Sequence, residues 1–221
     1  MFNRTRTFTM RYKHIIWDWN GTLLDDTWLC VEGINQALIK RKLTPISQFK
    51  YREVFTFPVK DYYMKLGFDF NKEPFEIAGD EFVSYYGENF HKTKLQNGSR
   101  FVLRAIHSNL ISQSILSAGR QDFLLDWVSF HKLEKYFLKI VGIDNQYAKG
   151  KIEQGIKLIN DLPYNEEDIV IVGDTIHDSD VAEKLKINCV LIDHGHVSGE
   201  RLKKTGRKVV SNFKDLIPHI L

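Results

Sequence analysis

The sequence predicts an α/β protein whose core is a parallel β-sheet flanked by helices. Short runs rich in Ile, Val and Leu alternate with segments in which hydrophobic residues recur at helical spacing. Such alternation is typical of βαβ units, in which each helix crosses over between two parallel strands. Residues 26–96 are the exception, because they contain helical patterns and no comparable strand run. We therefore expect a helical domain inserted into the sheet-containing core.

The expected strands begin with the apolar run that starts near residue 13 and ends at Asp18, before a polar Gly turn. The later strand runs lie at residues 110–118, 136–143, 168–174, 187–193 and 207–210. Residues 121–132 and 150–160 between them have helical spacing. Buried parallel strands form near-continuous apolar runs of this kind, so the pattern favours a sheet covered on both faces.

The length agrees with an insertion. A chain of 221 residues exceeds the usual single-domain size of roughly 100–150 residues but is too short for two full domains. Hydrophobic residues at helical spacing, such as Leu29, Ala37, Phe75 and Phe82, lie in the inserted stretch. We expect a discontinuous core at 1–25 and 97–221 and a helical cap at 26–96.

Charge and cysteine content exclude several functional classes. The 31 Lys and Arg residues nearly balance 28 Asp and Glu residues, so nucleic acid is not an expected partner. No apolar run approaches the ~20 residues of a membrane span. Cys30 and Cys189 lie in separate apolar segments without metal-ligand spacing. The basic first residues lack the apolar stretch of a secretory signal. We expect a cytoplasmic protein without a membrane partner.

Chemically reactive residues follow the expected strands. Asp18, Ser117 and Asp174 end three of them, and Lys151 begins the helix after another. In an open parallel sheet, ligands bind beyond the carboxyl ends of the strands. Carboxylates, a hydroxyl and an ammonium at one edge suit phosphoryl transfer. Asp174 and Asp178 lie one helical turn apart, and two like charges on one helix face favour a bound cation.

Four segments resemble the motifs of the haloacid dehalogenase (HAD) superfamily, in the usual order. They are DWNGTLLDD, the strand ending at Ser117, the lysine in GKIEQGIKLI, and VGDTIHDSD. The resemblance covers nearly the whole chain and implies an HAD-like Rossmannoid core. The insertion is similar to the helical C1 cap of the phosphoglycolate phosphatase and β-phosphoglucomutase branch. FTFPVKDYYMKLGFD, residues 55–69, also resembles cap sequence of phosphoglycolate phosphatase-like members.

The resemblance implies a catalytic nucleophile and a Mg²⁺ site. Asp18 would form an aspartyl-phosphate and also bind Mg²⁺. The backbone carbonyl of Asn20 and the carboxylate of Asp174 would be further ligands, with Asp178 binding directly or through a water. Such an all-oxygen set is what Mg²⁺ prefers.

The resemblance also implies the phosphate-binding residues. Ser117 and nearby backbone N–H groups would hold the phosphate oxygens. Lys151 would balance the charge on Asp18 and the phosphate; Lys149 is a rival, but Lys151 begins the GKIE helix. The other expected substrate-binding residues are Ala118, Gly119, Arg120 and the cap cations Arg52 and Lys60.

The aromatic residues of the expected cap and three histidines are not expected to take part in catalysis. We expect Phe55, Phe57, Tyr62 and Tyr63 to form the cap core rather than to contact substrate. His194 and His196, in a Gly-containing loop, are expected to be solvated, and His177 is given no role.

Asn20 departs from the phosphatase pattern. Most members carry a second Asp two residues after the nucleophile, which protonates the leaving group and later deprotonates the attacking water. An amide cannot exchange protons in this way. Loss of a positioned acid or base commonly costs around 10²–10⁴-fold in rate. Activity on ordinary alkyl phosphates is therefore in doubt.

Several accounts of Asn20 remain open. The substrate could be an acyl phosphate or phosphoanhydride that needs no acid, or the cap or substrate could deliver the proton. Phosphonoacetaldehyde hydrolases also lack the second Asp and use a cap lysine; Lys60 and Lys65 are available here without a matching motif. L-2-haloacid dehalogenases lack it too, but they need no metal, and the retained GDTIHDSD argues against that branch.

The function expected from the sequence is that of a Mg²⁺-dependent phosphatase. It would act on a small phosphorylated metabolite through an aspartyl-phosphate. The alternatives are a hydrolase of acyl phosphates or phosphonates and a catalytically weak protein that binds a phosphorylated ligand. Both a monomer and a dimer remain open.

Overall fold

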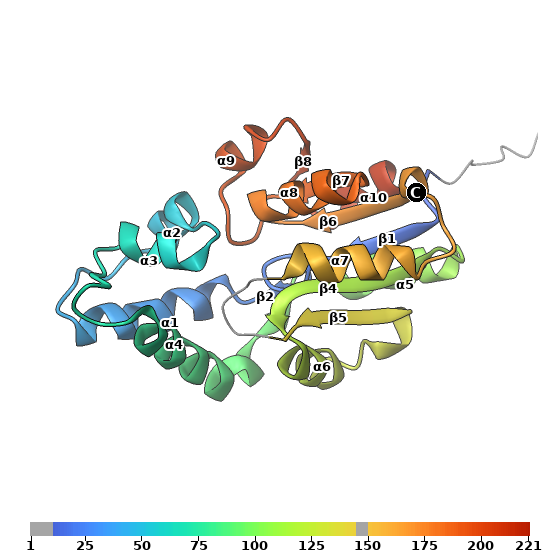
Figure 1. Cartoon of the computed structure of the whole chain (residues 1–221). Helices are drawn as coiled ribbons and strands as arrows, with labels where there is room; N and C mark the ends of the chain where they lie inside the picture. The colour runs from blue at the N-terminus through green and yellow to red at the C-terminus, as the bar shows by residue number, and fades with distance from the viewer. Residues whose placement is uncertain (1–10, 145–149) are drawn as a thin grey trace, which may run out of the picture.

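The computed structural model describes residues 11–144 and 150–221, and these contain a six-stranded parallel sheet in the order β5-β4-β1-β6-β7-β8 (Figure 1). The strands are β1 (His14–Trp17), β4 (Ser112–Arg120), β5 (Lys139–Ile143), β6 (Ile169–Gly173), β7 (Asn188–Ile192) and β8 (Lys208–Val210). The predicted α/β fold is confirmed, and each expected strand run contains a strand.

The helices are α1 (Thr27–Lys40), α2 (Gln48–Val54), α3 (Val59–Lys65), α4 (Phe75–Asn89), α5 (Ser99–Ser108), α6 (Gln121–Phe130), α7 (Lys151–Asn160), α8 (Ile176–Leu185), α9 (Gly199–Lys203) and α10 (Phe213–Ile220). Shorter 3-10 helices are η1 (Phe90–Lys92), η2 (Glu134–Tyr136) and η3 (Glu166–Asp168). Helices α7 and α8 contact each other on one side of the sheet, and α5 and α10 contact each other on the other.

Strand β1 lies at the centre of the sheet, and its four residues are all buried. Successive side chains point to opposite faces, as strand geometry requires. Ile16 belongs to the hydrophobic cluster beneath α7 and α8, whereas Ile15 and Trp17 belong to the cluster that includes α5 and α10. Burial on both faces explains why this strand is continuously apolar in the sequence.

The fourth strand differs from its expected bounds. It begins at Ser112, because Leu110 closes the turn after α5 with a φ of +59° and is 92% exposed. It also continues to Arg120, with a shift in its register against β5 between Leu116 and Arg120. A bulge re-aims side chains. Ser117 therefore lies in an irregular part of the strand rather than at its end.

The inserted segment leaves and rejoins the core through a two-stranded antiparallel ribbon. Strands β2 (Leu24–Asp25) and β3 (Lys94–Leu95) pair with Leu24 opposite Leu95. Helices α1 to α4 lie between them and form the lobe beside the carboxyl ends of the core strands (Figure 1). The division into a core at 1–25 and 97–221 and a cap at 26–96 stays a prediction.

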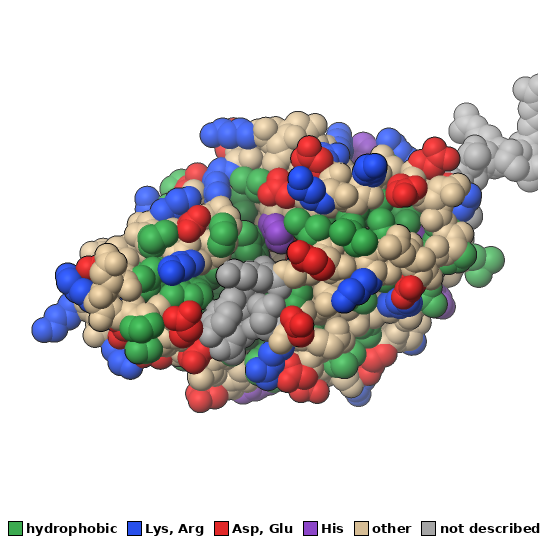
Figure 2. Space-filling model, in the orientation of Figure 1, with side chains coloured by type: hydrophobic (Ala, Val, Ile, Leu, Met, Phe, Trp, Pro, Cys, Tyr) green, Lys and Arg blue, Asp and Glu red, His purple; other side chains and the backbone are tan. Residues whose placement is uncertain are grey.

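The surface carries charges of both signs. On the face in Figure 2, Lys, Arg, Asp and Glu side chains are interspersed and form no broad patch of one sign among the described residues. In residues 11–144 and 150–221, no helix combines the length and apolar character that crossing a bilayer would need.

Candidate active site

Asp18 lies at the carboxyl end of the central strand. It directly follows β1, its backbone N–H donates to the carbonyl of Val172 at 2.9 Å, and it is 6% exposed. Lys151 is the first residue of α7 and is 2% exposed. Its Nζ lies 2.5 Å from Asp18 Oδ1 and 2.6 Å from Asp178 Oδ1. Residues from distant parts of the chain thus meet at one edge of the sheet.

Three buried carboxylates converge at this edge. One oxygen from each of Asp18, Asp174 and Asp178 lies within 4.8 Å of the others. Thr22 Oγ1 donates to Asp174 Oδ1 at 2.7 Å. Asp178 is oriented by the N-terminus of α8, where its Oδ2 accepts from the backbone N–H of Thr175 at 3.0 Å. The loop geometry also requires Gly21, since its φ is +75° and a Cβ there would lie 2.4 Å from Asp174 Oδ2.

The cluster holds more negative charge than its ammonium offsets. Burial raises the pKa of Asp18 to about 8. Repulsion from Asp178 and Asp174 acts in the same direction, and the attraction of Lys151 opposes it. Burial also raises the pKa of Asp174, to about 6. At Asp178 burial acts to raise the pKa, but the attraction and hydrogen bond of Lys151, together with the hydrogen bonds from Thr175, lower it below its usual value. A buried site with excess carboxylate charge and oxygen donors could hold a divalent cation.

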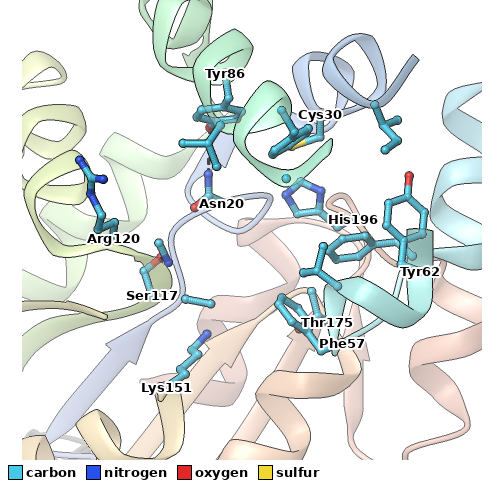
Figure 3. A pocket seen from close by; sticks show the side chains of 18 of the residues that line it. Asn20, Cys30, Phe57, Tyr62, Tyr86, Ser117, Arg120, Lys151, Thr175 and His196 are labelled. Carbon is cyan, nitrogen blue, oxygen red and sulfur yellow. Dashed lines mark hydrogen bonds between the residues drawn. The ribbon is translucent and has the colours of Figure 1, made fainter. Parts of the chain in front are cut away.

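The expected phosphate-binding residues face the same space. Asp18, Asn20, Ser117, Ala118, Gly119, Arg120 and Lys151 all line one cavity of about 200 Å³ (Figure 3). Ser117 is buried, and its Oγ accepts from the backbone N–H of Gly119 at 3.0 Å. The structure therefore brings together the expected nucleophile, ammonium and hydroxyl.

The two cap cations lie outside the cavity lining. Lys60 is exposed on α3, with its Nζ 5.5 Å from the ring centroid of Phe70. Arg52 donates to the backbone carbonyls of Asp193 and Val197, so it joins the cap to the core instead. A role for either side chain in substrate binding stays a prediction. Lys149, the rival of Lys151, falls outside the described residues.

Arg120 lines the cavity but already has a partner. Its Nε and Nη2 donate to the two carboxylate oxygens of Asp122 at 2.6 and 2.7 Å. Its guanidinium also lies over the ring of Phe123, at 3.9 Å from the centroid. This pairing reduces its ability to attract a second anionic group of a substrate.

Asn20 is held by a hydrogen-bond network that the sequence analysis missed. Its Nδ2 donates to Asp26 Oδ2 at 2.7 Å and to the Tyr86 hydroxyl at 2.9 Å. The Tyr86 hydroxyl donates to the same Asp26 oxygen at 2.7 Å. Asp26 is fully buried. The sequence signal for this network is the second carboxylate of the Asp25–Asp26 pair, at the end of the first motif.

The expectation of solvated histidines is wrong. His196 is 4% exposed, with Nε2 3.3 Å from Asp26 Oδ1 and Nδ1 3.0 Å from the Tyr51 hydroxyl. Burial acts to lower the pKa of His196, but Asp26, with Asp174 and Asp18, raises it to about 9. His194 is half-buried and its Nε2 donates to the carbonyl of Thr22 at 3.0 Å. Carboxylate and carbonyl partners thus hold this Gly-containing loop against the core.

The cap aromatics have a second role besides packing. Tyr62 and Tyr63 are buried, as expected of a cap core, yet they and Phe55 and Phe57 also line the cavity. His177, which was given no role, packs against Phe57 with ring centroids 4.7 Å apart.

Comparisons with solved structures support the fold. The chain is 21% identical to a predicted phosphatase from Clostridium acetobutylicum, with a TM-score of 0.81 and coverage of 95% of this chain and 98% of that one. A predicted phosphoglycolate phosphatase from Haemophilus somnus gives 16% identity, a TM-score of 0.78 and coverage of 96% and 100%. Protein Tyrosine Kinase A from Mycobacterium tuberculosis is 18% identical, with a TM-score of 0.78 and coverage of 95% of this chain and 98% of that one. At such identities the likeness concerns the fold.

The family is shown by sequence. No curated protein matches the chain as a recognisable relative. Residues 15–192 match the family model described as haloacid dehalogenase-like hydrolase, and this range includes every motif residue discussed above. The chain therefore belongs to the haloacid dehalogenase-like hydrolases, a family of enzymes, as its four ordered motifs indicate.

Proposed function

We propose that the protein is a Mg²⁺-dependent phosphatase that acts on a small phosphorylated metabolite through an aspartyl-phosphate at Asp18. The observation that carries the proposal is the buried Asp18 carboxylate, which Lys151 holds beside Asp174 and Asp178. The names of the structural relatives from Clostridium acetobutylicum and Haemophilus somnus agree with a phosphatase.

The geometry leaves one oxygen of Asp18 available for attack. Lys151 binds Oδ1 at 2.5 Å, whereas Oδ2 accepts only a long hydrogen bond from Thr22 Oγ1, at 3.4 Å, so Oδ2 is the atom that would form a bond to phosphorus. As that bond forms, the bond from phosphorus to the leaving oxygen breaks, and the leaving oxygen keeps the electron pair. Ser117 and Lys151 line the same cavity and can donate hydrogen bonds to the phosphate oxygens.

Mg²⁺ would be held by Asp18 and Asp174, with Asp178 nearby and the Asn20 carbonyl as the remaining ligand. When bound, it would offset the charge of the carboxylates and the phosphate. The oxygen-only donor set and the excess buried negative charge fit this ion.

The leaving group must depart without a proton from residue 20. Both N–H bonds of the Asn20 amide are already directed at Asp26 and Tyr86. This observation favours substrates whose leaving oxygen is stable as an anion, including acyl phosphates. Water must then attack the phosphorus of the aspartyl-phosphate, which releases phosphate and restores Asp18. A slow second step would make the protein a weak enzyme that accumulates as the aspartyl-phosphate.

The test compares purified wild-type protein with the Asp18→Asn variant on acetyl phosphate and para-nitrophenyl phosphate. We expect turnover that requires Mg²⁺, stops on chelation, and falls at least about 10³-fold in Asp18→Asn, since the amide is not a nucleophile. Asp25→Asn removes an exposed carboxylate nearby and should leave the rate within about twofold. Equal rates in wild type and Asp18→Asn would contradict the proposal.

A further inference from the structure

The cavity at Asp18 continues into the cap, and there its wall is aromatic. Rings from the cap and from α6 line it, including Phe57, Tyr62, Phe75, Phe82, Tyr86 and Trp127. Figure 3 shows Phe57 and Tyr62 on one side of the space and Tyr86 across from them, with Lys151 at the phosphate end. A leaving group attached to a phosphate at Asp18 would therefore extend between aromatic side chains.

Neighbouring rings support one another and hold the wall in place. Tyr86 packs against Trp127 with centroids 5.2 Å apart, and Phe57 packs against Phe55 at 5.4 Å. Rings fixed in this way can present faces and edges to a further ring at low conformational cost. The wall thus has the form of a binding surface for a flat apolar group.

The described cations around the cavity are already paired, which weakens their attraction for a second anionic group of the substrate. Among the described lining residues, each cation faces a carboxylate: Lys151 faces Asp18 and Asp178, Arg120 faces Asp122, and His196 faces Asp26. Among the described residues, none of the lysines or arginines of the cap lines the cavity. A buried carboxylate without a cation is strongly unfavourable.

We propose that the leaving group of the substrate is uncharged and aromatic, so that the enzyme acts on aryl phosphate monoesters. This inference rests on the proposed phosphatase function and names its substrate class. The volume of about 200 Å³ includes the space at Asp18 that the phosphate would occupy, and the remainder suits a single ring, because a cavity of about 150 Å³ already accommodates benzene.

An aryl leaving group also accounts for Asn20. When Asp18 Oδ2 attacks, the bond between phosphorus and the phenolic oxygen breaks, and the oxygen leaves with the electron pair as a phenolate. A phenol has a pKa of about 10, so its anion is stable enough to depart before it takes a proton from water. The enzyme then needs no acid at residue 20 in this step.

The test measures kcat and KM for phenyl phosphate, benzyl phosphate and phosphoglycolate with Mg²⁺. We expect phenyl and benzyl phosphate to share a KM about tenfold or more below that of phosphoglycolate, since both carry the ring. Only phenyl phosphate should have a high kcat, because the benzyl alkoxide is a poor leaving group. A kcat/KM for phosphoglycolate equal to that for phenyl phosphate would overturn the proposal.

A matched pair of variants on α4 probes the cavity directly. Val83→Lys places an ammonium in the lining, whereas Ile77→Lys places one on the exposed face of the same helix. We expect Val83→Lys to lower the KM for phosphoglycolate relative to the KM for phenyl phosphate by about tenfold. Ile77→Lys should leave this ratio of KM values unchanged. Equal ratios in the two variants would contradict the assignment of the cavity to the leaving group.

Two readouts separate this inference from the proposed function. Hydrolysis of acetyl phosphate that depends on Asp18, without any preference for the ring, would overturn only the substrate class. If no substrate is turned over, calorimetric titration with phenylphosphonate and phosphonoacetate still decides the inference. Tighter binding of phenylphosphonate supports the aromatic site, and tighter binding of phosphonoacetate refutes it.

Discussion

The two ends of strand β1 bury ionisable groups in different ways. At the amino end, His14 is fully buried, its Nδ1 lies 2.7 Å from Ser112 Oγ, and its Nε2 has no hydrogen-bond partner among the described residues. Burial lowers the pKa of His14 to about 4, so it is neutral. At the carboxyl end, Asp18 is equally enclosed but has an ammonium at 2.5 Å.

The difference shows what distinguishes a structural burial from a candidate catalytic one. Burial alone drives an ionisable side chain to its neutral form, and the His14 end of the strand accepts that outcome. The Asp18 end instead places three carboxylates around one ammonium. Burying these charges costs desolvation free energy, so the arrangement is not explained by packing alone. The groups that keep their charge there are Lys151, whose pKa is raised by the neighbouring carboxylates, and Asp178, whose pKa is lowered, and this buried ion pair marks the reactive edge of the sheet.

The largest expected effect comes from removing the ammonium at the reactive end. In Lys151→Met, Asp18 and Asp178 remain buried without their cation, so we expect the free energy of unfolding to fall by about 3–5 kcal/mol in metal-free buffer. Chemical denaturation measures this change. Lys157→Met, on the exposed face of the same helix, should change stability by less than about 0.5 kcal/mol. Equal stability of both variants would contradict the view that the buried carboxylates at the Asp18 end depend on Lys151.

The next effect concerns the amide beside the nucleophile. In Asn20→Asp, the new carboxylate would lie where Nδ2 now meets Asp26 Oδ2 at 2.7 Å, so the two acids would share a proton. We expect Asn20→Asp/Asp26→Asn, in which residue 20 is the single acid, to gain about 10²-fold in kcat on benzyl phosphate. Asn20→Asp alone should gain less, and Asp26→Asn alone should gain nothing. Equal rates for the single and double Asn20 variants would show that Asp26 does not restrict the site.

The smallest effect tests the neutral end. The unfolded chain takes up a proton at His14 near pH 6.5, whereas the folded protein resists it until about pH 4. Stability is therefore present above pH 6.5 and is lost as the pH falls, by about 2 kcal/mol between pH 7 and pH 4.5. Chemical denaturation of His14→Phe at both pH values should show that its free energy of unfolding falls by about 2 kcal/mol less than that of wild type. His91→Gln, an exposed control, should retain the wild-type loss.

The sequence predicted the fold and the reactive edge for a physical reason. Strands buried on both faces must be apolar throughout, and the polar residues that follow them stand out. Asp18, Ser117, Lys151 and Asp174 could be placed together because parallel strands end at one edge of a sheet.

The remaining contacts of the site depend on the tertiary structure. Asn20, Asp26, Tyr86 and His196 meet in one network, yet no spacing in the sequence relates them. A Gly-flanked histidine is typical of a solvated loop, and the tertiary contacts with Asp26, Tyr51 and Asp174 explain why His196 is enclosed. The aromatic cavity wall was equally hidden, since residues such as Tyr62 have the same composition and spacing whether they fill a core or surround a space.

The β2–β3 ribbon also bears on how the chain folds. Strand β1 ends at Trp17 and its neighbour β4 begins at Ser112, so the central pairing of the sheet must close a long loop. Pairing of Leu24 with Leu95 closes most of that loop beforehand and leaves two short connections. Loop-closure entropy grows with loop length, and distant strand pairings slow folding. Once the β2–β3 ribbon has formed, β1 and β4 are therefore separated by two short connections instead of the whole inserted segment.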